Sequence, residues 1–467
     1  MAFTMTRKHS PQRPLHVLFL HLDWGIGGAE QLMCQLADAS LALGHRIDLL
    51  TTHCEPSHCF DSLSPDGGHL YPFLHVKGRW IPHDIAGKAR ALCSTLRLLW
   101  LAYQAARRAP PDLIVTDVLP TPLPLLRDAP LLFYCHFPDQ LLKQSQTTSA
   151  WTRLYRSLTN ALEAHTMSYS DVCVVNSHFT QRVVRETFAI ATDLPVLYPA
   201  LDTASLETES SDNDDASNKE LLFVSLNRYE RKKDLALFLR AVAQLRCQDR
   251  MPKLVVAGGY DPINTENVEY HNELQALAQQ LGVSVQFERS ISGARRLQLL
   301  QTATAVVYTP SNEHFGIVPL EAMYVGTPVV ACASGGPLET VLDGTTGYLC
   351  EPTPEAFAKA LQSFVDDPDK ARTMGQAARD HVRDRFGPER LQSEWRALCA
   401  QAVERGRSRR SRILSIRTVL LACESLVVLL LCFGLARLLS LVVWDSNEWF
   451  WEHMRVWLLR HKGDNEL

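Results

Sequence analysis

The chain alternates short apolar runs with longer amphipathic stretches, and this pattern predicts an α/β protein. The apolar run at 14–23 is followed by glycines and then by a stretch with helical spacing, which Gly44 ends. Further strands are predicted at 45–53, 111–118, 130–138 and 171–177, with a helix at 90–109. Strands that alternate with helices in this way are typical of a parallel sheet covered on both faces.

The alternation stops at 202–220, a segment that is acidic, rich in serine and free of aromatic residues, so we expect an exposed linker there. We therefore predict two Rossmann-like domains, at 15–201 and 221–403, after a disordered basic N-terminus at 1–14. A cleft between two such domains is the default ligand site. In the second domain we expect strands at 221–228, 253–259, 283–288, 304–310 and 327–332, and helices at 234–246 and 270–281.

The last part of the chain has a different composition. An arginine-rich block at 404–412 reads as a juxtamembrane segment, and the apolar run at 413–444 exceeds the ~20 residues that cross a bilayer core of ~30 Å. Glu424 and Arg437 within it are costly in lipid. We predict a membrane anchor and tail at 413–467, either as one span or as an in-plane segment; an amphipathic helix docked on the protein is the alternative. The positive-inside rule then keeps both α/β domains cytosolic.

Composition narrows the function classes. An apolar content of 46% supports packed cores, and a net charge of −4 argues against a nucleic-acid-binding protein, which needs a basic excess. The 12 cysteines are scattered without a C-x-x-C pair, so most are expected to be buried thiols in a reducing compartment. No N-x-[ST] sequon and no cleavable signal peptide occur, which agrees with a cytosolic location.

Three glycines, Gly25, Gly27 and Gly28, lie between the first strand and the first helix. They allow a tight turn whose backbone approaches a ligand, next to a helix N-terminus that attracts anions. A turn without a ligand is the alternative. A dinucleotide-binding fold would need an acid at the end of the second strand. Because the chain has Thr51-Thr52-His53 there, a Rossmann oxidoreductase is disfavoured.

Basic residues follow the first strand of the second domain, where they suit a diphosphate through charge-assisted contacts and the helix dipole. For Arg231 a solvated turn is the preferred interpretation. The next strand ends in Gly258 and Gly259, which mark either a close backbone approach to a ligand or a simple turn. The basic residues of the turn are Arg228, Arg231, Lys232 and Lys233.

His136 ends a predicted buried strand of the first domain, so we expect it to face the ligand cleft, although a core histidine is the alternative. Asp139 and Lys143 beyond it are compatible with a polar turn.

Two carboxylates of the second domain form another candidate site. Glu313 lies in the loop after a strand, and Glu321 lies in the first turn of a helix predicted from Pro319. Both carboxylates can accept hydrogen bonds from the hydroxyl groups of a sugar. The alternative is that Glu321 is present only because acidic residues are favourable near a helix N-terminus, but this does not account for Glu313.

The combination of these motifs resembles the retaining GT-B glycosyltransferases that use nucleotide sugars, over about residues 15–400. It comprises the Glu313-x7-Glu321 pair, the R-x4-K spacing of Arg228 and Lys233, the glycine loop and "SGGPLE" at 334–339. More narrowly, the chain resembles the mannosyltransferases that add the second and third mannoses to a lipid-linked oligosaccharide. The segments that carry this likeness are "FLHLDWGIGGAE", "FYCHFPD", "NRYERKK", "VAGGYD" and "TPSNEHFGIVPLEAMY".

This resemblance implies the substrates and the location. GDP-mannose would donate mannose to a dolichyl-diphosphate chitobiose-mannose acceptor through α1,3 and then α1,6 linkages, on the cytosolic face of the endoplasmic reticulum. Membrane lipid and other mannosyltransferases of the pathway are the further expected partners, and nucleic acid is not. The alternatives are another GT-B enzyme acting on a lipid or an oligosaccharide, and a non-catalytic membrane-tethered scaffold.

The resemblance also assigns roles at the second domain. Arg228 and Lys233, with Lys232, would hold the diphosphate and stabilise it as the leaving group. Glu321 would bind the ribose. Glu313 and the His314-Phe315-Gly316 loop would contact the mannosyl ring. Gly258 and Gly259 are the further residues implied at the donor.

In the first domain His136 would position the sugar or the acceptor, and Gly27 and Gly28 would approach the donor phosphate or the acceptor. Retention in this family proceeds front-side, with the departing phosphate helping to deprotonate the acceptor hydroxyl. Asp234 stands where the general pattern has glycine, which leaves the geometry of the phosphate turn open. Asp367-Pro368-Asp369 is expected at the surface between helices, so we predict no cofactor and no divalent cation at the donor site.

Overall fold

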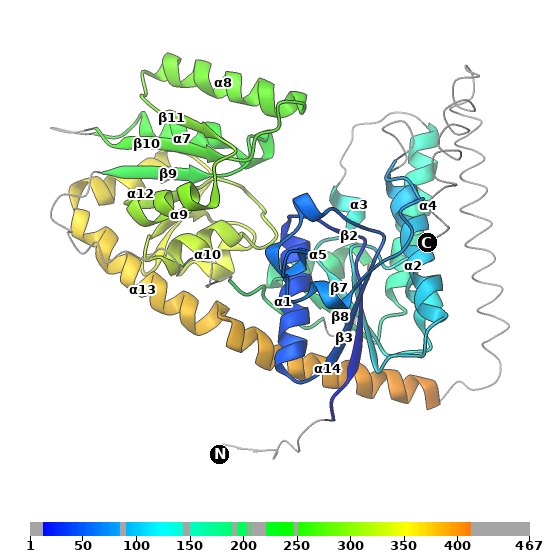
Figure 1. The fold of residues 1–467 in the computed structure, drawn as a ribbon. Helices are drawn as coiled ribbons and strands as arrows, with labels where there is room; N and C mark the ends of the chain where they lie inside the picture. Colours follow the sequence, from blue (N-terminus) through cyan, green and yellow to red (C-terminus); the bar gives the residue numbers. More distant parts are fainter. Residues whose placement is uncertain are drawn as a thin grey trace. The chain divides into compact units, whose positions relative to one another are not determined.

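The computed structural model describes residues 13–84, 90–142, 150–188, 194–201, 203, 206, 221–246 and 251–411, which form two compact units (Figure 1). Unit 1 holds the described residues through Val174, residues 194–195 and those from Glu394 onward. Unit 2 holds the described residues of 175–191 and 196–393. The predicted linker, apart from Thr203 and Leu206, and the predicted anchor at 413–467 lie outside the described residues.

Unit 1 is built on a six-stranded sheet with the order β5-β3-β1-β6-β7-β8. The pairs from β5 through β7 are parallel, and β1, β6 and β7 are buried almost throughout, as their apolar sequences predict. The short edge strand β5 was not predicted, because three half-buried residues give no clear pattern. The strands are β1 (His16–Leu20), β3 (Arg46–Thr51), β5 (Leu74–Val76), β6 (Leu113–Asp117), β7 (Leu131–Cys135) and β8 (Val172–Val175).

Helices follow these strands in chain order. Helix α1 (Gly28–Ala42) ends where Gly44 adopts a left-handed conformation with φ +77°, which confirms the predicted stop. Helix α2 (Arg90–Ala106) confirms the helix predicted at 90–109. Two helices after β7, the short α3 (Asp139–Leu142) and α4 (Ala150–Met167), complete the part of unit 1 that precedes β8.

Unit 2 repeats the architecture, with six parallel strands in the order β11-β10-β9-β12-β13-β14. The predicted strands are confirmed, while β14 was not predicted. Its strands are β9 (Leu222–Leu226), β10 (Lys253–Gly258), β11 (Gln286–Arg289), β12 (Ala305–Tyr308), β13 (Val329–Cys332) and β14 (Gly347–Cys350). The helices used below are α7 (Leu235–Val242), α8 (Thr265–Leu281), α9 (Gly293–Thr302), α10 (Ile317–Tyr324), α12 (Pro354–Asp366) and α13 (Pro368–Phe386).

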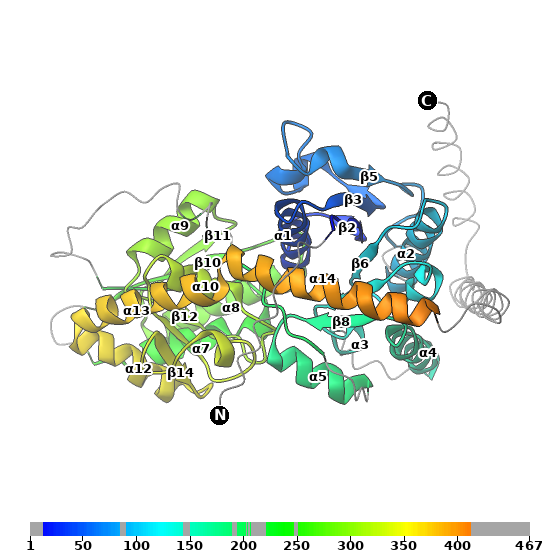
Figure 2. The same ribbon diagram turned by 90° about the horizontal axis from the view of Figure 1, so that it is seen from below.

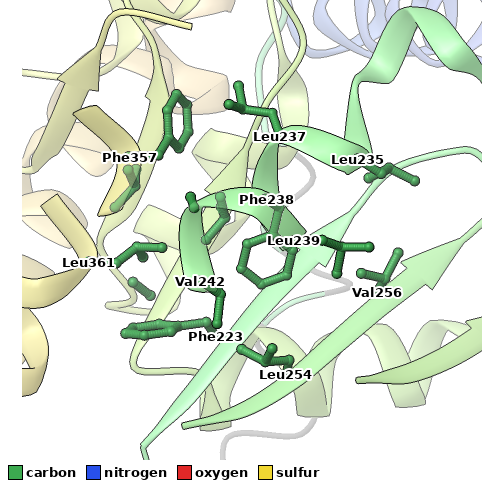
Figure 3. Packing of buried hydrophobic residues seen from close by; sticks show 14 of the residues in the cluster. Phe223, Leu235, Leu237, Phe238, Leu239, Val242, Leu254, Val256, Phe357 and Leu361 are labelled. Atoms are coloured by element: carbon green, nitrogen blue, oxygen red, sulfur yellow. The ribbon is translucent and has the colours of Figure 1, made fainter. Parts of the chain in front are cut away.

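The sheet of unit 2 is buried on both faces, because successive strand residues point to opposite sides. Phe223 belongs to one buried cluster with α7 and α12 residues such as Phe238 and Phe357 (Figure 3), whereas the next residue, Val224, belongs to the cluster that α10 and α13 cover. Strands β9 and β10 are therefore apolar at consecutive positions, as expected for a parallel sheet between two helical layers.

Helix α14 (Pro388–Ser411) is one continuous helix, drawn in orange in Figure 2. Residues 404–411 of the predicted juxtamembrane block are its last turns, which corrects their separation from the α/β domains. The Arg409 guanidinium contacts both Asp171 carboxylate oxygens of unit 1, with N–O distances of 2.8 and 2.9 Å, so it is a structural cation there. The described residues contain no helix that is both long and apolar enough to span a bilayer.

The described cysteines are all free thiols. All of them are buried except Cys59, which is half-buried. The predicted thiol state is thus confirmed for the described part of the chain.

Trp395 tests the assignment of the C-terminal helix to unit 1. Its side chain is fully buried, packs near Phe19 and donates its indole N–H to the Ser40 hydroxyl at 2.9 Å. We expect Trp395→Ala to destabilise unit 1 by about 3–5 kcal/mol, because it leaves a cavity and removes the hydrogen bond to the Ser40 hydroxyl. Urea unfolding followed by circular dichroism measures this loss. The matched control is Trp80→Ala, since Trp80 is 51% exposed; equal losses in both variants would contradict the assignment.

Candidate active site

The first candidate cluster lies at the carboxyl ends of β9 and β12, two neighbouring strands of unit 2. Lys233 belongs to the short 3-10 helix after β9 (Arg231–Lys233), and Glu313 belongs to the loop after β12. Their side chains form an ion pair, and the Thr309 hydroxyl donates to the Lys233 carbonyl at 2.6 Å. Lys233 and Glu313, which the resemblance assigns to one donor, therefore lie side by side.

The Lys233–Glu313 pair is largely withdrawn from water, with side-chain exposures of 12% and 23%. Burial alone would raise the pKa of Glu313, but the adjacent Lys233 ammonium outweighs it and lowers that pKa below its ordinary value. Burial, together with the negative charge of Glu313, raises the pKa of Tyr308 far above its usual range. The site therefore holds an ionised carboxylate and a neutral phenol.

The glycines of "SGGPLE" support the loop that carries Glu313. Gly336 donates its N–H to the Glu313 carbonyl at 2.7 Å, and a Cβ on Gly335 or Gly336 would collide with loop backbone. Gly335 also has φ +65°, a conformation that favours glycine. The Ser177 hydroxyl donates to the His314 carbonyl at 2.6 Å. These contacts hold the Glu313 loop in place, so the glycines of "SGGPLE" have a structural role within the chain.

Glu321 pairs with a residue that the sequence did not suggest. Helix α10 begins at Ile317, because Gly316 at its N-cap has φ +83°, so Glu321 lies in the second turn and not in the first turn as predicted. The side chain of Glu321 forms an ion pair with Arg296 of α9. No sequence motif surrounds Arg296. Only the contact between α9 and α10 in the folded chain identifies it as a candidate site residue.

The remaining basic residues of the turn divide into two groups. Arg228 and Lys232 are about two-thirds exposed and share one carboxylate, Glu230, with N–O distances of 3.2 and 3.0 Å. Arg231 pairs with Glu269 and Glu273 on α8, which agrees with its preferred interpretation as a surface residue.

The nearby glycine pair and Asp234 have local structural reasons. Gly258 has φ +150° and packs on the Asn227 backbone, and a Cβ on Gly259 would lie 3.0 Å from the Arg228 side chain. Packing thus explains both glycines, and their contact with a ligand stays a prediction. Asp234, which replaces the usual glycine, has φ 43° in the left-handed region, so the turn keeps the backbone geometry that favours glycine.

The second candidate cluster lies at the carboxyl ends of β1, β6 and β7, the central strands of unit 1. Asp117 is fully buried and bridges two imidazoles: its Oδ1 lies 2.8 Å from His21 Nδ1, and its Oδ2 lies 2.9 Å from His136 Nε2. His136 is 24% exposed and His21 is buried. The position predicted for His136 at a strand end is confirmed, while Asp117 and His21 were missed although each also follows an apolar run.

Electrostatics keeps His21 and Asp117 of this cluster ionised. Burial by itself would lower the pKa of His21, but the Asp117 carboxylate, helped by Glu30 at 3.8 Å, raises that pKa to about 10. Burial would likewise raise the pKa of Asp117, whereas the two imidazoles lower it to about 2. His21 is therefore an imidazolium and Asp117 a carboxylate at neutral pH.

The glycine loop faces a carboxylate of its own chain. Gly27 is the N-cap of α1, and the Glu30 carboxylate folds back so far that a Cβ on Gly27 would overlap it. A Cβ on Gly28 would meet no atom, and one on Gly25 would meet none closer than 3.9 Å. Because Glu30 already supplies negative charge to this helix N-terminus, the loop is better suited to hydroxyl groups than to a phosphate.

The segment after His136 is fixed by Glu163. The carboxylate of this buried residue on α4 accepts the N–H groups of Asp139 and Gln140 at 2.8 and 3.3 Å. Burial raises the pKa of Glu163 to about 7. Lys143 lies outside the described residues.

Within the described ranges no three His, Cys, Asp or Glu side chains are grouped to hold a metal ion. Asp369, of the Asp367-Pro368-Asp369 segment, lies exposed beside Arg372 in the first turn of α13. The absence of a cation from the donor site stays a prediction.

Comparisons with known proteins identify the family. The family described as "Glycosyltransferase Family 4" matches residues 26–205, and "Glycosyl transferases group 1" matches residues 207–381. The alpha-1,3/1,6-mannosyltransferase ALG2 of Homo sapiens is 42% identical over 393 residues, which cover 80% of this chain and 92% of that protein. The chain belongs to the alpha-1,3/1,6-mannosyltransferase family. It is thus a GT-B glycosyltransferase, as its motifs predicted.

Other relatives and solved structures agree. The family member of Saccharomyces cerevisiae is 36% identical, covering 74% of this chain and 76% of that protein. Anabaena Alr3699/HepE in complex with UDP and glucose has a TM-score of 0.61 at 20% identity, covering 83% and 99% of the two chains. Sucrose-phosphate synthase of Thermosynechococcus elongatus has a TM-score of 0.63 at 21% identity, covering the same 83% and 99%. The structural matches support the fold alone.

The raised pKa of His21 predicts how stability depends on pH. A group whose pKa is raised in the folded state stabilises it fully below its unfolded pKa, about 6.5. This contribution therefore declines from pH 6.5 upward and is gone above about pH 10. We expect the stability difference between the wild type and His21→Gln to shrink over that range, by at most about 1.4 kcal/mol per pH unit. Urea unfolding from pH 6 to 10 measures it, and a constant difference would contradict the assignment.

Proposed function

We propose that this family member transfers mannose from GDP-mannose to a dolichyl-diphosphate chitobiose-mannose acceptor, first by an α1,3 and then by an α1,6 linkage. The proposal is supported by relatives up to 42% identical that are named alpha-1,3/1,6-mannosyltransferases. The observation that carries it is the Lys233–Glu313 pair beside exposed cations, because a nucleotide sugar offers a diphosphate and hydroxyls side by side.

The charge balance of the cluster in unit 2 favours a diphosphate. Three cations, Arg228, Lys232 and Lys233, face two carboxylates, Glu230 and Glu313, so one positive charge is unmatched within these ion pairs. The exposed Arg228 and Lys232 are accessible to phosphate oxygens. Cations fixed near a departing diphosphate stabilise the charge that develops on it, which is electrostatic catalysis.

Donor binding would rearrange two ion pairs, Lys233–Glu313 and Arg296–Glu321. A diphosphate that attracts the Lys233 ammonium leaves the Glu313 carboxylate to accept hydrogen bonds from mannosyl hydroxyls. The Glu321 carboxylate, paired with Arg296 without ligand, would accept the ribose hydroxyls in the same way. The His314-Phe315-Gly316 segment would then line the sugar.

The acceptor would be handled by unit 1. His136 is the partly exposed member of its cluster and would orient a hydroxyl of the sugar or the acceptor. The loop of Gly25, Gly27 and Gly28 offers close backbone approach to acceptor hydroxyls, in keeping with the carboxylate of Glu30 beside it. Retention would follow a front-side path, in which the departing phosphate accepts the proton of the attacking hydroxyl.

We further propose that the enzyme works on the cytosolic face of the endoplasmic reticulum membrane and is anchored through 413–467, alongside other mannosyltransferases of the pathway. Support comes from the apolar composition of that segment and from a lipid-linked acceptor. A variant that ends at Ser411 should be found outside the membrane fraction. Such a release from the membrane would support this anchor.

A transfer assay tests the proposed function directly. Purified protein in detergent receives GDP-mannose, a lipid-diphosphate chitobiose-mannose acceptor and EDTA, and products are resolved by mass. We expect a gain of two hexoses without a divalent cation. A gain of one hexose would assign the second linkage to another enzyme, and no gain with an intact acceptor would contradict the function.

Substitutions in the ion pair test the donor site. We expect Lys233→Met and Glu313→Gln each to lower kcat/KM by roughly 100-fold or more, because one removes a leaving-group contact and the other a sugar contact. Arg231→Met is the matched control: it removes a neighbouring cation that pairs with α8, and we expect a change below about twofold, as for exposed ion pairs. Full activity in both test variants would contradict the donor site.

A further inference from the structure

The cluster of unit 1 contains more buried charge than the proposed function uses. Asp117, at the end of β6, has no exposed side-chain surface, and each of its carboxylate oxygens contacts a different histidine from a neighbouring strand. An isolated buried carboxylate is strongly unfavourable. Only His136 among the three reaches solvent, so the other two act on it from inside the protein.

The bridge fixes where the protons lie. A carboxylate only accepts hydrogen bonds, so the Nε2 of His136, at 2.9 Å from Asp117 Oδ2, must carry a proton. In the neutral ring Nδ1 is then the accepting nitrogen. By the same rule His21 donates from Nδ1 to Asp117 Oδ1 at 2.8 Å.

The two histidines differ in their surroundings. His21 is buried and lies between two carboxylates, Asp117 at 2.8 Å and Glu30 at 3.8 Å, whereas His136 contacts Asp117 at 2.9 Å and is partly exposed. The Trp24 ring packs against His21 and the Tyr134 ring against His136, each with a centroid distance of 4.9 Å.

The backbone at this point is held in an unfavourable conformation. Val118, directly after Asp117, has φ +63°, which is rare for a β-branched residue, and the Leu119 N–H donates to the Asp117 carbonyl at 2.8 Å. Strain of this kind persists where the surrounding contacts require one geometry, and it is concentrated at functional sites. The bend turns the chain immediately after the strand and leaves the Asp117 side chain buried between the two rings.

We propose that Asp117 is a positioning residue for the transfer reaction, whose carboxylate, bridged to His21 on its other oxygen, holds the His136 ring with the proton on Nε2. Held so, the partly exposed His136 ring has one orientation from which it would contact a hydroxyl of the acceptor. This inference rests on the proposed function for the identity of that hydroxyl, and on the described contacts for the tautomer.

The tautomer is measured in the wild-type full chain, in detergent, labelled with 15N-histidine. Long-range 1H–15N correlation at pH 7.5 should show His136 with a proton on Nε2 and His21 protonated on both nitrogens. His136→Gln and His21→Gln assign the two signals by their loss. A His136 protonated on Nδ1 alone, or a neutral His21, overturns the proposal; both states are read from the wild type, and the variants serve only for assignment.

Kinetics of Asp117→Asn test the consequence. We expect kcat to fall roughly 100-fold, as for a misplaced catalytic group, while KM for GDP-mannose changes less than about twofold, because the cluster that would bind the donor lies in unit 2. The variant should also show a neutral His21 and mixed tautomers of His136. A folded variant that retains wild-type kcat overturns the proposal.

Unit 1 contains a matched control. Asp48 on β3 also bridges two imidazoles, His16 Nε2 at 2.8 Å and His75 Nε2 at 3.2 Å, but it is partly exposed and lies away from the strand ends. Asp48→Asn should leave kcat within about twofold, and an equal loss in both variants would show a general stability effect and overturn the specific role. If the wild type transfers no mannose while His136 keeps its tautomer, the proposed function fails and the positioning geometry stands.

Discussion

The pairing of buried charge at the carboxyl ends of parallel strands is the constraint on which both candidate clusters depend. Parallel sheets bury both faces, so polar side chains are pushed to the strand ends, where all strands finish on one edge. There each buried ion needs a partner, because an unpaired one costs several kcal/mol. Lys233 with Glu313, and His21 with Asp117, meet this requirement.

The same constraint links stability to reactivity. In the absence of a ligand, the two residues of an ion pair neutralise each other. A ligand with matching charges can replace this contact, because it supplies a new partner for each of the two side chains. The Lys233–Glu313 and Arg296–Glu321 pairs are of this kind, each joining residues from two different elements. The His21–Asp117–His136 cluster differs, because its central carboxylate is inaccessible and serves to orient a neighbour.

Backbone geometry explains several motif residues that would otherwise be assigned to ligands. Gly335 and Gly336 let the Glu313 loop pack closely, and Gly258 packs against Asn227. Asp234 keeps the left-handed turn after Lys233 despite its side chain. A glycine-rich motif can thus shape a site through contacts within the chain, as well as through contact with a substrate.

The sequence by itself determined the two α/β domains, most strands, the family and the ends at which the site residues lie. It could do so because apolar periodicity and strand-end chemistry are local properties, visible around His136, Lys233 and Glu313. Only the tertiary structure decided the partners. Arg296 pairs with Glu321 and Asp117 with His21, which are distant in sequence, and Trp395 packs helix α14 into unit 1. Pairing between distant segments depends on strand order and helix packing, which no local pattern encodes.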